Sequence, residues 1–260
     1  MSRLNRASPS MTVLVQLSDP HIGADWGHGD PATALAAAVG SVRALELDVD
    51  AVLVSGDLTE HGADAEYERV RELLAPLGAP LHVLAGNHDD RAALRRHFGL
   101  PGSGEEPVQY AADLGPLRLV ALDSTVPGED RGELDADRLA WLDAELAAAA
   151  GTPTVVALHH PPLLTGIAGL DAFALDADSR SALAEVVERH ANVRRLVAGH
   201  VHRGVTGELA GRVVLAAPST YLQARLDLRS EQLQFAPGPA AFAVHALLDG
   251  ALVSHIQPVG

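Results

Sequence analysis

The stretch VLVQLSDPHIG, residues 13–23, joins a short apolar, β-branched run to the polar residues Asp19 and His21. Similar apolar runs recur along the chain and alternate with segments rich in Ala, Leu, Glu and Arg that have a helical period. This alternation is typical of an α/β fold. In open α/β sheets, ligands bind at the carboxyl ends of the strands, so we expect a site beside Asp19 and His21.

The same patterns predict the other elements of the fold. We expect strands at 12–17, 51–55, 81–85, 108–112, 117–122, 153–158 and 194–198, and helices at 31–46, 64–76, 90–97, 135–149 and 179–189. After residue 200 the sequence predicts two hairpins, which turn at 210–211 and at 249–250. The chain has no long linker and no internal repeat, so it predicts a flexible tail at 1–10 and one domain at 11–260.

The composition excludes several kinds of chemistry. The 260 residues include 34 acidic and 19 basic side chains, giving a formal net charge of -15, and no cysteine. Without cysteine there is no disulfide, thiolate nucleophile or cysteine-ligated zinc, so any metal must be held by oxygen and imidazole. An acidic chain with 3% aromatic residues lacks the basic, stacking surface that nucleic-acid polymers require, so none is expected as a partner.

The lengths and positions of the apolar segments indicate the cellular location and bear on the oligomeric state. The run at 13–17 is too short for the core of a signal peptide, and no stretch reaches the ~20 apolar residues of a membrane span. We therefore expect a cytoplasmic protein without a membrane partner. The apolar segments AFAVHALL and ALVSHI either complete a sheet or contribute to a homodimer interface.

Polar residues follow the expected strands at five separate places. Two divalent ions about 3.5–4 Å apart need a bridging carboxylate, hard oxygen donors and neutral imidazoles. In D-x-H and H-x-H on an extended segment, the two side chains would share a face because side chains alternate along a strand. The residues that supply such a set are Asp19, His21, Asp57, Asn87, His159, His200 and His202.

The order of these motifs resembles a known family. The series consists of D-x-H at 19–21, G-D at 56–57, G-N-H-D at 86–89, His159 and G-H-x-H at 199–202. It resembles the calcineurin-like metallophosphoesterase superfamily. H-H-P-P at 159–162, G-H-V-H-R at 199–203 and A-P-S-T at 217–220 resemble its bacterial branch of class III cyclic-nucleotide phosphodiesterases and glycerophosphodiesterases. The resemblance implies an α/β four-layer sandwich, with two mixed β-sheets flanked by helices and a β-rich C-terminus.

The resemblance also implies a role for each motif residue. Asp19, His21, Asp57 and His202 would hold one metal ion. Asp57, Asn87, His159 and His200 would hold a second, with Asp57 as the bridge. The family places Fe, Mn or Zn ions, divalent or trivalent, at such positions. His88 would contact the phosphoryl oxygen and assist the leaving group, and Asp89 would orient His88.

The activity implied by the resemblance is hydrolysis of a phosphodiester. The expected enzyme is a binuclear metal-dependent phosphodiesterase that uses in-line attack of a metal-bound hydroxide. Its substrates would be cyclic nucleotides or small phosphodiesters such as glycerophosphodiesters. A phosphomonoesterase or a nuclease of the same superfamily, and a non-catalytic binding protein that retains the fold, are the alternatives.

Several residues near the motifs keep two interpretations. Trp26 either forms a wall on which a purine could stack or packs a loop. His160 is either beside the metal ligands or structural, and Arg203 lies either where an anionic substrate approaches or on the surface. Tyr221 and Gln223 are weaker candidates of the same kind. His61 is interpreted as a loop residue. The remaining histidines are interpreted as surface or structural residues; they are His28, His82, His97, His190, His245 and His255.

Overall fold

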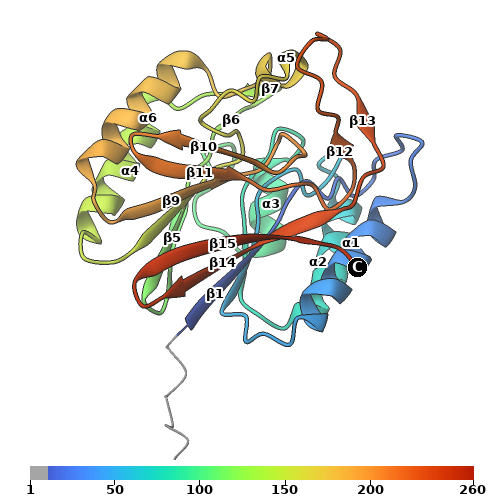
Figure 1. The fold of residues 1–260 in the computed structure, drawn as a ribbon, viewed down its shortest axis with the longest axis horizontal. Coiled ribbons are helices and arrows are strands. Elements are labelled where there is room, and N and C mark those ends of the chain that lie inside the picture. Colours follow the sequence, from blue (N-terminus) through green and yellow to red (C-terminus); the bar gives the residue numbers. More distant parts are fainter. Residues whose placement is uncertain (1–10) are drawn as a thin grey trace, which may run out of the picture.

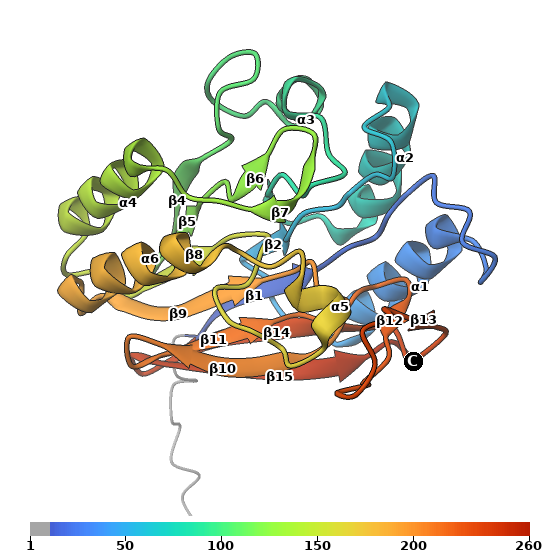
Figure 2. The ribbon, with the colours of Figure 1, turned by 90° about the horizontal axis from the view of Figure 1, so that it is seen from above.

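Two β-sheets lie face to face between two layers of helices in the computed structural model, which describes residues 11–260 (Figures 1 and 2). The tail expected at 1–10 lies outside the described residues. The first sheet has the order β15-β14-β1-β2-β3, in which β1, β2 and β3 are parallel, β14 pairs antiparallel with β1, and β15 pairs antiparallel with β14. Its strands are β1 (Met11–Leu17), β2 (Ala51–Val54), β3 (Leu81–Val83), β14 (Ala241–Leu248) and β15 (Ala251–Pro258).

The second sheet is also mixed and has the order β10-β11-β9-β8-β5-β4. Its inner strands run parallel, and the two edge strands β10 and β4 pair antiparallel with their neighbours. Its strands are β4 (Tyr110–Leu114), β5 (Leu117–Ala121), β8 (Thr154–Ala157), β9 (Val193–Ala198), β10 (Val205–Leu209) and β11 (Arg212–Ala216). The expected four-layer sandwich of two mixed sheets with a β-rich C-terminus is therefore confirmed.

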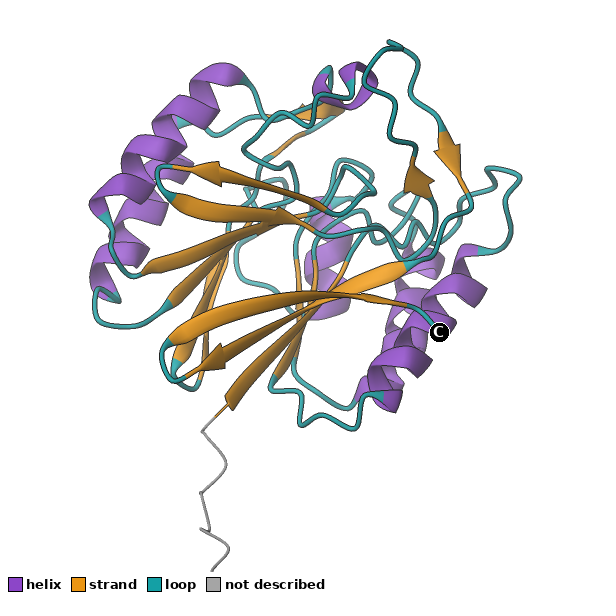
Figure 3. Cartoon of the chain, in the orientation of Figure 1, coloured by secondary structure: helices purple, strands orange, loops and turns teal. Residues whose placement is uncertain are grey.

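Helices cover the outer face of each sheet, and Figure 3 shows them on both sides of the strands. Those packed on the first sheet are α1 (Pro31–Ala44), α2 (Asp64–Leu74) and α3 (Arg91–Phe98). Those packed on the second are α4 (Ala136–Ala148) and α6 (Ala177–Arg189). Most of these helices begin after an aspartate, as at Asp30, whose carboxylate accepts hydrogen bonds from the amides of Ala32 and Thr33. Part of the acidic composition therefore serves as helix caps.

Alternation along the strands divides the core into layers. On β1, Val13, Val15 and Leu17 pack with the helices, whereas Leu14 packs in a cluster between the two sheets. Strands buried on both faces read as continuous apolar runs, which is why the sequence signals them clearly. The carboxyl ends of β1, β2 and β3 in one sheet and of β8 and β9 in the other are thereby brought together.

The sequence did not predict the shortest elements. These are η1 (Ala75–Leu77), α5 (Ala168–Asp171) and the two-stranded sheets formed by β6 (Thr125–Val126) with β7 (Glu129–Gly132) and by β12 (Gln223–Ala224) with β13 (Phe235–Ala236). Elements of two to four residues are too short to display a period. Both expected hairpins form, β10 with β11 and β14 with β15, and Ala210 and Asp249 take positive φ angles at their turns. No helix of the described residues is both long and apolar enough to cross a bilayer.

A buried polar group lies between the sheets and gives a pH prediction. The ring of His245 contacts Gln16 Oε1 at 3.0 Å and Ser254 Oγ at 2.6 Å. Burial, with a smaller contribution from the charge of Arg195, lowers the pKa of His245 to about 3. Below the ordinary histidine pKa of about 6.5, the unfolded chain binds a proton here that the folded chain does not bind. The free energy of unfolding therefore falls as the pH drops from about 6.5 towards 3.

The substitution His245→Gln keeps polar contacts without a titrating group, so it should reduce this pH dependence. We expect the free energy of unfolding of the variant to decline less steeply, by up to about 1.4 kcal/mol per pH unit. Urea unfolding at several pH values between 7 and 4 measures the difference. Other titrating groups contribute equally to both proteins, so parallel curves would contradict the assignment to His245.

Candidate metal centre

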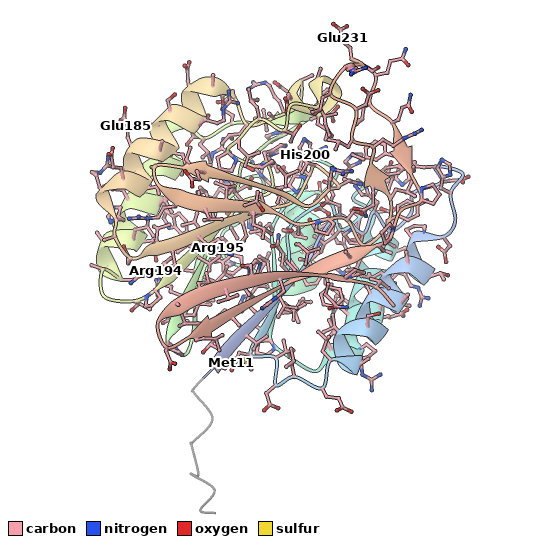
Figure 4. All side chains as sticks on the ribbon, viewed as in Figure 1. Met11, Glu185, Arg194, Arg195, His200 and Glu231 are labelled. Atoms are coloured by element: carbon pink, nitrogen blue, oxygen red, sulfur yellow. The ribbon has the colours of Figure 1, made fainter. Side chains whose placement is uncertain are left out.

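The polar residues predicted from the sequence converge in the structure. They follow β1, β2, β3, β8 and β9, so three loops come from the first sheet and two from the second. Figure 4 shows His200 among the loops inside the molecule, whereas Glu185 points outward from α6. The sandwich therefore brings together, at one edge, side chains that lie far apart in the sequence.

One group, here called the first cluster, consists of Asp19, His21, Asp57 and His202. All four are buried, and their ligand atoms lie within 4.8 Å of one another. The Nε2 atom of His21 is 3.0 Å from Nε2 of His202 and 3.4 Å from Oδ2 of Asp57. Nε2 of His202 is 3.7 Å from Oδ1 of Asp19.

A second group, here called the second cluster, consists of Asp57, Asn87, His159 and His200. Nε2 of His159 is 3.3 Å from Oδ2 of Asp57 and 3.1 Å from Oδ1 of Asn87. The same Asn87 oxygen is 3.1 Å from Nδ1 of His200. One oxygen of Asp57 therefore faces an imidazole of each cluster, which is the position of a bridging carboxylate.

Hydrogen bonds on the far side of each ring determine which nitrogen faces the centre. Nδ1 of His21 contacts Glu60 Oε2 at 2.8 Å, and Nδ1 of His202 contacts the Leu222 carbonyl at 3.0 Å. If each Nδ1 donates its proton, the two facing Nε2 atoms present lone pairs to each other. An added proton or a metal cation relieves the repulsion between them, and the carboxylates alongside favour a cation. The donor set therefore fits a metal ion.

The rings of the second cluster are held in the same manner. Nδ1 of His159 contacts the Ser55 carbonyl at 2.8 Å, and Nε2 of His200 contacts the Phe173 carbonyl at 3.1 Å. Each carbonyl accepts the proton of the nitrogen beside it, so the opposite nitrogen, Nε2 of His159 or Nδ1 of His200, faces Asn87. Burial lowers the pKa of both His200 and His202 to about 3, so both rings are neutral at pH 7, the form that binds metals.

The carboxylates of the centre are electrostatically coupled. Burial raises the pKa of Asp19 to about 6, although the charge of His159 opposes the rise. Burial would also raise the pKa of Asp57, but the charges of His159 and His21 hold it well below its usual range. Burial opposes the charge on His159, yet Asp57 raises the pKa of that ring to about 9. A cation bound at this site would supply the positive charge that these buried carboxylates need.

The backbone at the centre differs from the sequence expectation. The prediction that D-x-H and H-x-H lie on extended segments is wrong, because these residues adopt left-handed backbone angles in loops. The φ angles are 49° at Asp19, 46° at His21, 49° at Asp57, 68° at His200 and 46° at His202. Left-handed angles in residues other than glycine cost energy and concentrate at functional sites. The two histidines of H-x-H do not share a face, because His200 lies in the second cluster and His202 in the first.

Two motif glycines let the loops approach closely. A Cβ atom at Gly86 would overlap the Asp57 carboxylate and its backbone nitrogen. A Cβ atom at Gly199 would overlap Ser18 Oγ and the Ser55 carbonyl. The absence of a side chain at these positions therefore allows the ligand loops to pack against one another.

Asp89 does not orient His88 as expected. Its carboxylate accepts hydrogen bonds from the amides of Gly86, Leu58 and Thr59 and from the hydroxyl of Tyr67. These contacts fix the G-N-H-D turn against the loop after β2. The ring of His88 is held by Glu60, whose carbonyl lies 3.1 Å from Nδ1. Asp89 therefore acts on the turn that carries His88 and not on its ring.

A cavity of about 170 Å³ opens over both clusters. The lining residues are His21, Trp26, Asp57, Asn87, His88, Asp130, Leu170, Phe173, His200, His202, Leu233 and Phe235. The centre therefore lies at the bottom of a pocket whose rim is largely apolar.

Trp26 lines this pocket and also packs its own loop. Its ring centroid lies 4.7 Å from that of His21 and 5.5 Å from that of Phe235. Tyr221 supports it from behind at 5.6 Å. Both interpretations of Trp26 are therefore compatible, because one face can support the loop while the residue borders the cavity.

The remaining candidates differ in their distance from the clusters. His160 is buried beside the second cluster, with its ring centroid 4.5 Å from that of His200. Its ring also contacts Ser124 Oγ and the Asp130 carbonyl, so its two interpretations are compatible. Arg203 and Gln223 line a separate cavity of about 430 Å³ and not the pocket over the clusters. Sequence reasoning identified Trp26 as a possible wall but missed Glu60 and the part of the rim formed by Leu233 and Phe235. The position of Glu60 three residues after Asp57 was its only sequence signal, and nothing indicated Leu233 and Phe235.

A two-sheet sandwich whose strand ends deliver carboxylates and imidazoles into a pocket defines a metal-dependent hydrolase. The family described as calcineurin-like phosphoesterase matches residues 12–204, and the chain belongs to this family. The predicted resemblance is thus confirmed.

Named relatives agree with the family. The chain is 32% identical over 248 residues to the 3′,5′-cyclic adenosine monophosphate phosphodiesterase CpdA of Pseudomonas aeruginosa, covering 94% of this chain and 85% of that protein. It is 33% identical over 219 residues to the glycerophosphodiester phosphodiesterase GpdQ of Enterobacter lignolyticus, covering 81% and 78%. A dimetal phosphatase from Danio rerio shares the fold, with a TM-score of 0.74, 19% identity and coverage of 97% and 98%.

Proposed function

We propose that this protein is a metal-dependent phosphodiesterase that hydrolyses cyclic nucleotides or small phosphodiesters such as glycerophosphodiesters. The observation that carries the proposal is the placement of the two clusters around Asp57 at the bottom of one pocket. The activities named for the relatives support the choice of a diester.

The pocket lining supports a diester over the alternatives. No arginine or lysine is among the described residues that line it. A phosphomonoester carries a second negative charge that would find no cationic side chain there. A nucleic-acid strand would need a basic groove, which the net charge of -15 also disfavours. A purely non-catalytic protein would have no need for a buried, electrostatically coupled ligand set.

The residues of the two clusters would hold two metal ions. Asp19, His21, Asp57 and His202 would bind one, and Asp57, Asn87, His159 and His200 would bind the other. Bound divalent ions supply Lewis acidity, which polarises phosphoryl oxygens and lowers the pKa of water towards ~7. The carbonyls of Ser55, Leu222 and Phe173 keep the rings oriented for this purpose.

His88 would handle the proton at the leaving group. Its Nδ1 is occupied by the Glu60 carbonyl, and its side chain is 32% exposed on the pocket. Its Nε2 therefore faces the pocket, and in the ring form protonated on both nitrogens this atom would donate a proton to the departing oxygen. The apolar rim of Trp26 and Phe235 would exclude water from one side of the reacting ester.

A substrate panel tests the proposal. We expect hydrolysis of bis(p-nitrophenyl) phosphate, cyclic AMP or a glycerophosphodiester to exceed hydrolysis of p-nitrophenyl phosphate by more than ~10-fold, because no arginine or lysine lines the pocket to pair with the second charge of a dianion. The chelated protein should be inactive, and added Mn²⁺ should restore its activity. Faster hydrolysis of the monoester would assign a phosphomonoesterase, and no hydrolysis with metals bound would reject the enzyme.

The identity of the metals, the cellular location and the assembly state are further parts of the proposal. The metals are expected to be two of Fe, Mn or Zn, the ions that the family places at such positions. Oxygen and imidazole ligands do not select among these ions. The cytoplasmic location expected from the sequence remains a prediction, and so does the homodimer, which was one of two alternatives for the C-terminal segments. Elemental analysis of the purified protein and its mass at sedimentation equilibrium check the metals and the assembly.

A further inference from the structure

Glu60 lies outside both clusters, yet it is fixed beside one of them. It is in the loop after β2, and its amide donates a hydrogen bond to the Ile22 carbonyl at 2.9 Å. This bond ties the loop to the neighbouring segment that carries His21. The side chain of Glu60 is only 15% exposed, so its carboxylate is held within the protein.

The two carboxylate oxygens of Glu60 serve different donors. Oε2 lies 2.8 Å from Nδ1 of His21, and Oε1 accepts the indole proton of Trp26 at 3.2 Å. A carboxylate can accept on both oxygens, whereas an amide of the same shape has one acceptor and one donor group. Glutamine could therefore satisfy one of these two partners and would oppose the other.

The partner of His21 differs from those of the other predicted imidazole ligands. His202, His159 and His200 contact neutral backbone carbonyls. On the ring nitrogen that faces away from the clusters, His21 alone among these four contacts a carboxylate. A carboxylate partner fixes the ring tautomer and raises the basicity of the nitrogen that faces the metal. The first cluster therefore contains the one imidazole of the four whose far-side nitrogen is held by a carboxylate.

Glu60 also connects this cluster to the pocket. Its carbonyl lies 3.1 Å from Nδ1 of His88, and its carboxylate holds Trp26, which borders the cavity. The ring of Trp26 is 4.7 Å from the ring of His21. The first cluster is therefore in direct contact with Trp26 on the pocket rim.

We propose that Glu60 is a positioning residue that fixes the orientation of His21, strengthens metal binding at the first cluster and couples its occupancy to Trp26. The inference rests on the metal centre of the proposed function. It does not depend on which phosphate ester is the substrate, because metal binding can be measured without turnover.

Metal titration of the metal-free full-length protein tests the role of Glu60. We expect two Mn²⁺ ions to bind the wild type, and Glu60→Gln to weaken one of them by about 10–100-fold while the other is unchanged. The matched control is Glu66→Gln, since Glu66 Oε1 lies 2.7 Å from Nδ1 of His61, a histidine in neither cluster. The control should bind both ions as the wild type does.

Tryptophan emission supplies a second measurement, and its first part, on protein that keeps Glu60, does not depend on the stability of Glu60→Gln. The chain has two tryptophans, so Trp141→Phe leaves Trp26 as the only emitter. Paramagnetic Mn²⁺ should quench this emission as the first cluster fills. Adding Glu60→Gln to this variant should move the midpoint to a 10–100-fold higher concentration.

The outcomes separate this inference from the proposed function. Three results would each overturn the positioning role. Glu60→Gln could leave both Mn²⁺ affinities unchanged, it could weaken both positions equally, or the emission of Trp26 could stay constant as Mn²⁺ binds. A third ion that binds the wild type and is lost in Glu60→Gln would make Glu60 a ligand and also overturn it. A wild type that binds both ions and hydrolyses no phosphodiester would reject the proposed function and leave this inference standing.

Discussion

Replacing Asp57 with asparagine is expected to reduce turnover by about 10³–10⁵-fold, or about 4–7 kcal/mol of activation free energy. The reason is geometric, because Asp57 Oδ2 lies 3.4 Å from His21 Nε2 and 3.3 Å from His159 Nε2, between the clusters. A neutral amide cannot supply the negative charge that both metal positions share. Hydrolysis of bis(p-nitrophenyl) phosphate and the metal content of Asp57→Asn measure the two effects together.

The control for Asp57→Asn is another carboxylate that contacts an imidazole. Asp143 on α4 lies 2.8 Å from Nε2 of His190 and is remote from the clusters. Asp143→Asn should retain both metal ions and full turnover. If Asp57→Asn keeps two ions and near-normal turnover, Asp57 does not bridge the centre.

Replacing His88 with alanine is expected to lower turnover by about 10²–10⁴-fold, the usual contribution of a positioned acid or base. Metal content should remain at the wild-type level, because His88 belongs to neither cluster. The loss should be larger for an ester with a poor alkoxide leaving group than for one that releases p-nitrophenolate. The reason is that p-nitrophenolate departs without a proton.

His61→Ala is the matched control for His88→Ala. His61 lies in the loop after Asp57, its side chain is 66% exposed, and its partner is Glu66. Its removal should change neither metal content nor turnover. Equal losses for good and poor leaving groups in His88→Ala would contradict proton donation by His88, and near-normal turnover would remove it from the mechanism.

The main layers of the fold were predictable because the signals are local and repeated. Fully buried strands such as β1 and β8 appear as continuous apolar runs, and the amphipathic α2 keeps Tyr67, Val70 and Leu74 on its buried face. The short β12 and β13 were not predictable. Each has two residues, and their pairing depends on contacts that form only after the sheets assemble.

The kinds of residue at the site were predictable, but their roles were less so. Asp89 looks like a partner for its neighbour His88, yet it binds amides in the loop after β2. The reason is that the G-N-H-D turn folds its carboxylate back towards Leu58 and Thr59. The prediction from adjacency in the sequence therefore named the wrong hydrogen-bond partner for Asp89.

The sequence by itself determined the fold class and the set of candidate ligands, because apolar periodicity and the spacing of the motifs are properties of the linear chain. The tertiary structure decided which side chains meet. His21 and His202, 181 residues apart, come within 3.0 Å, whereas His200 and His202, two residues apart, lie in different clusters. It also decided that Glu60 supports His21, since that contact depends on how two loops pack.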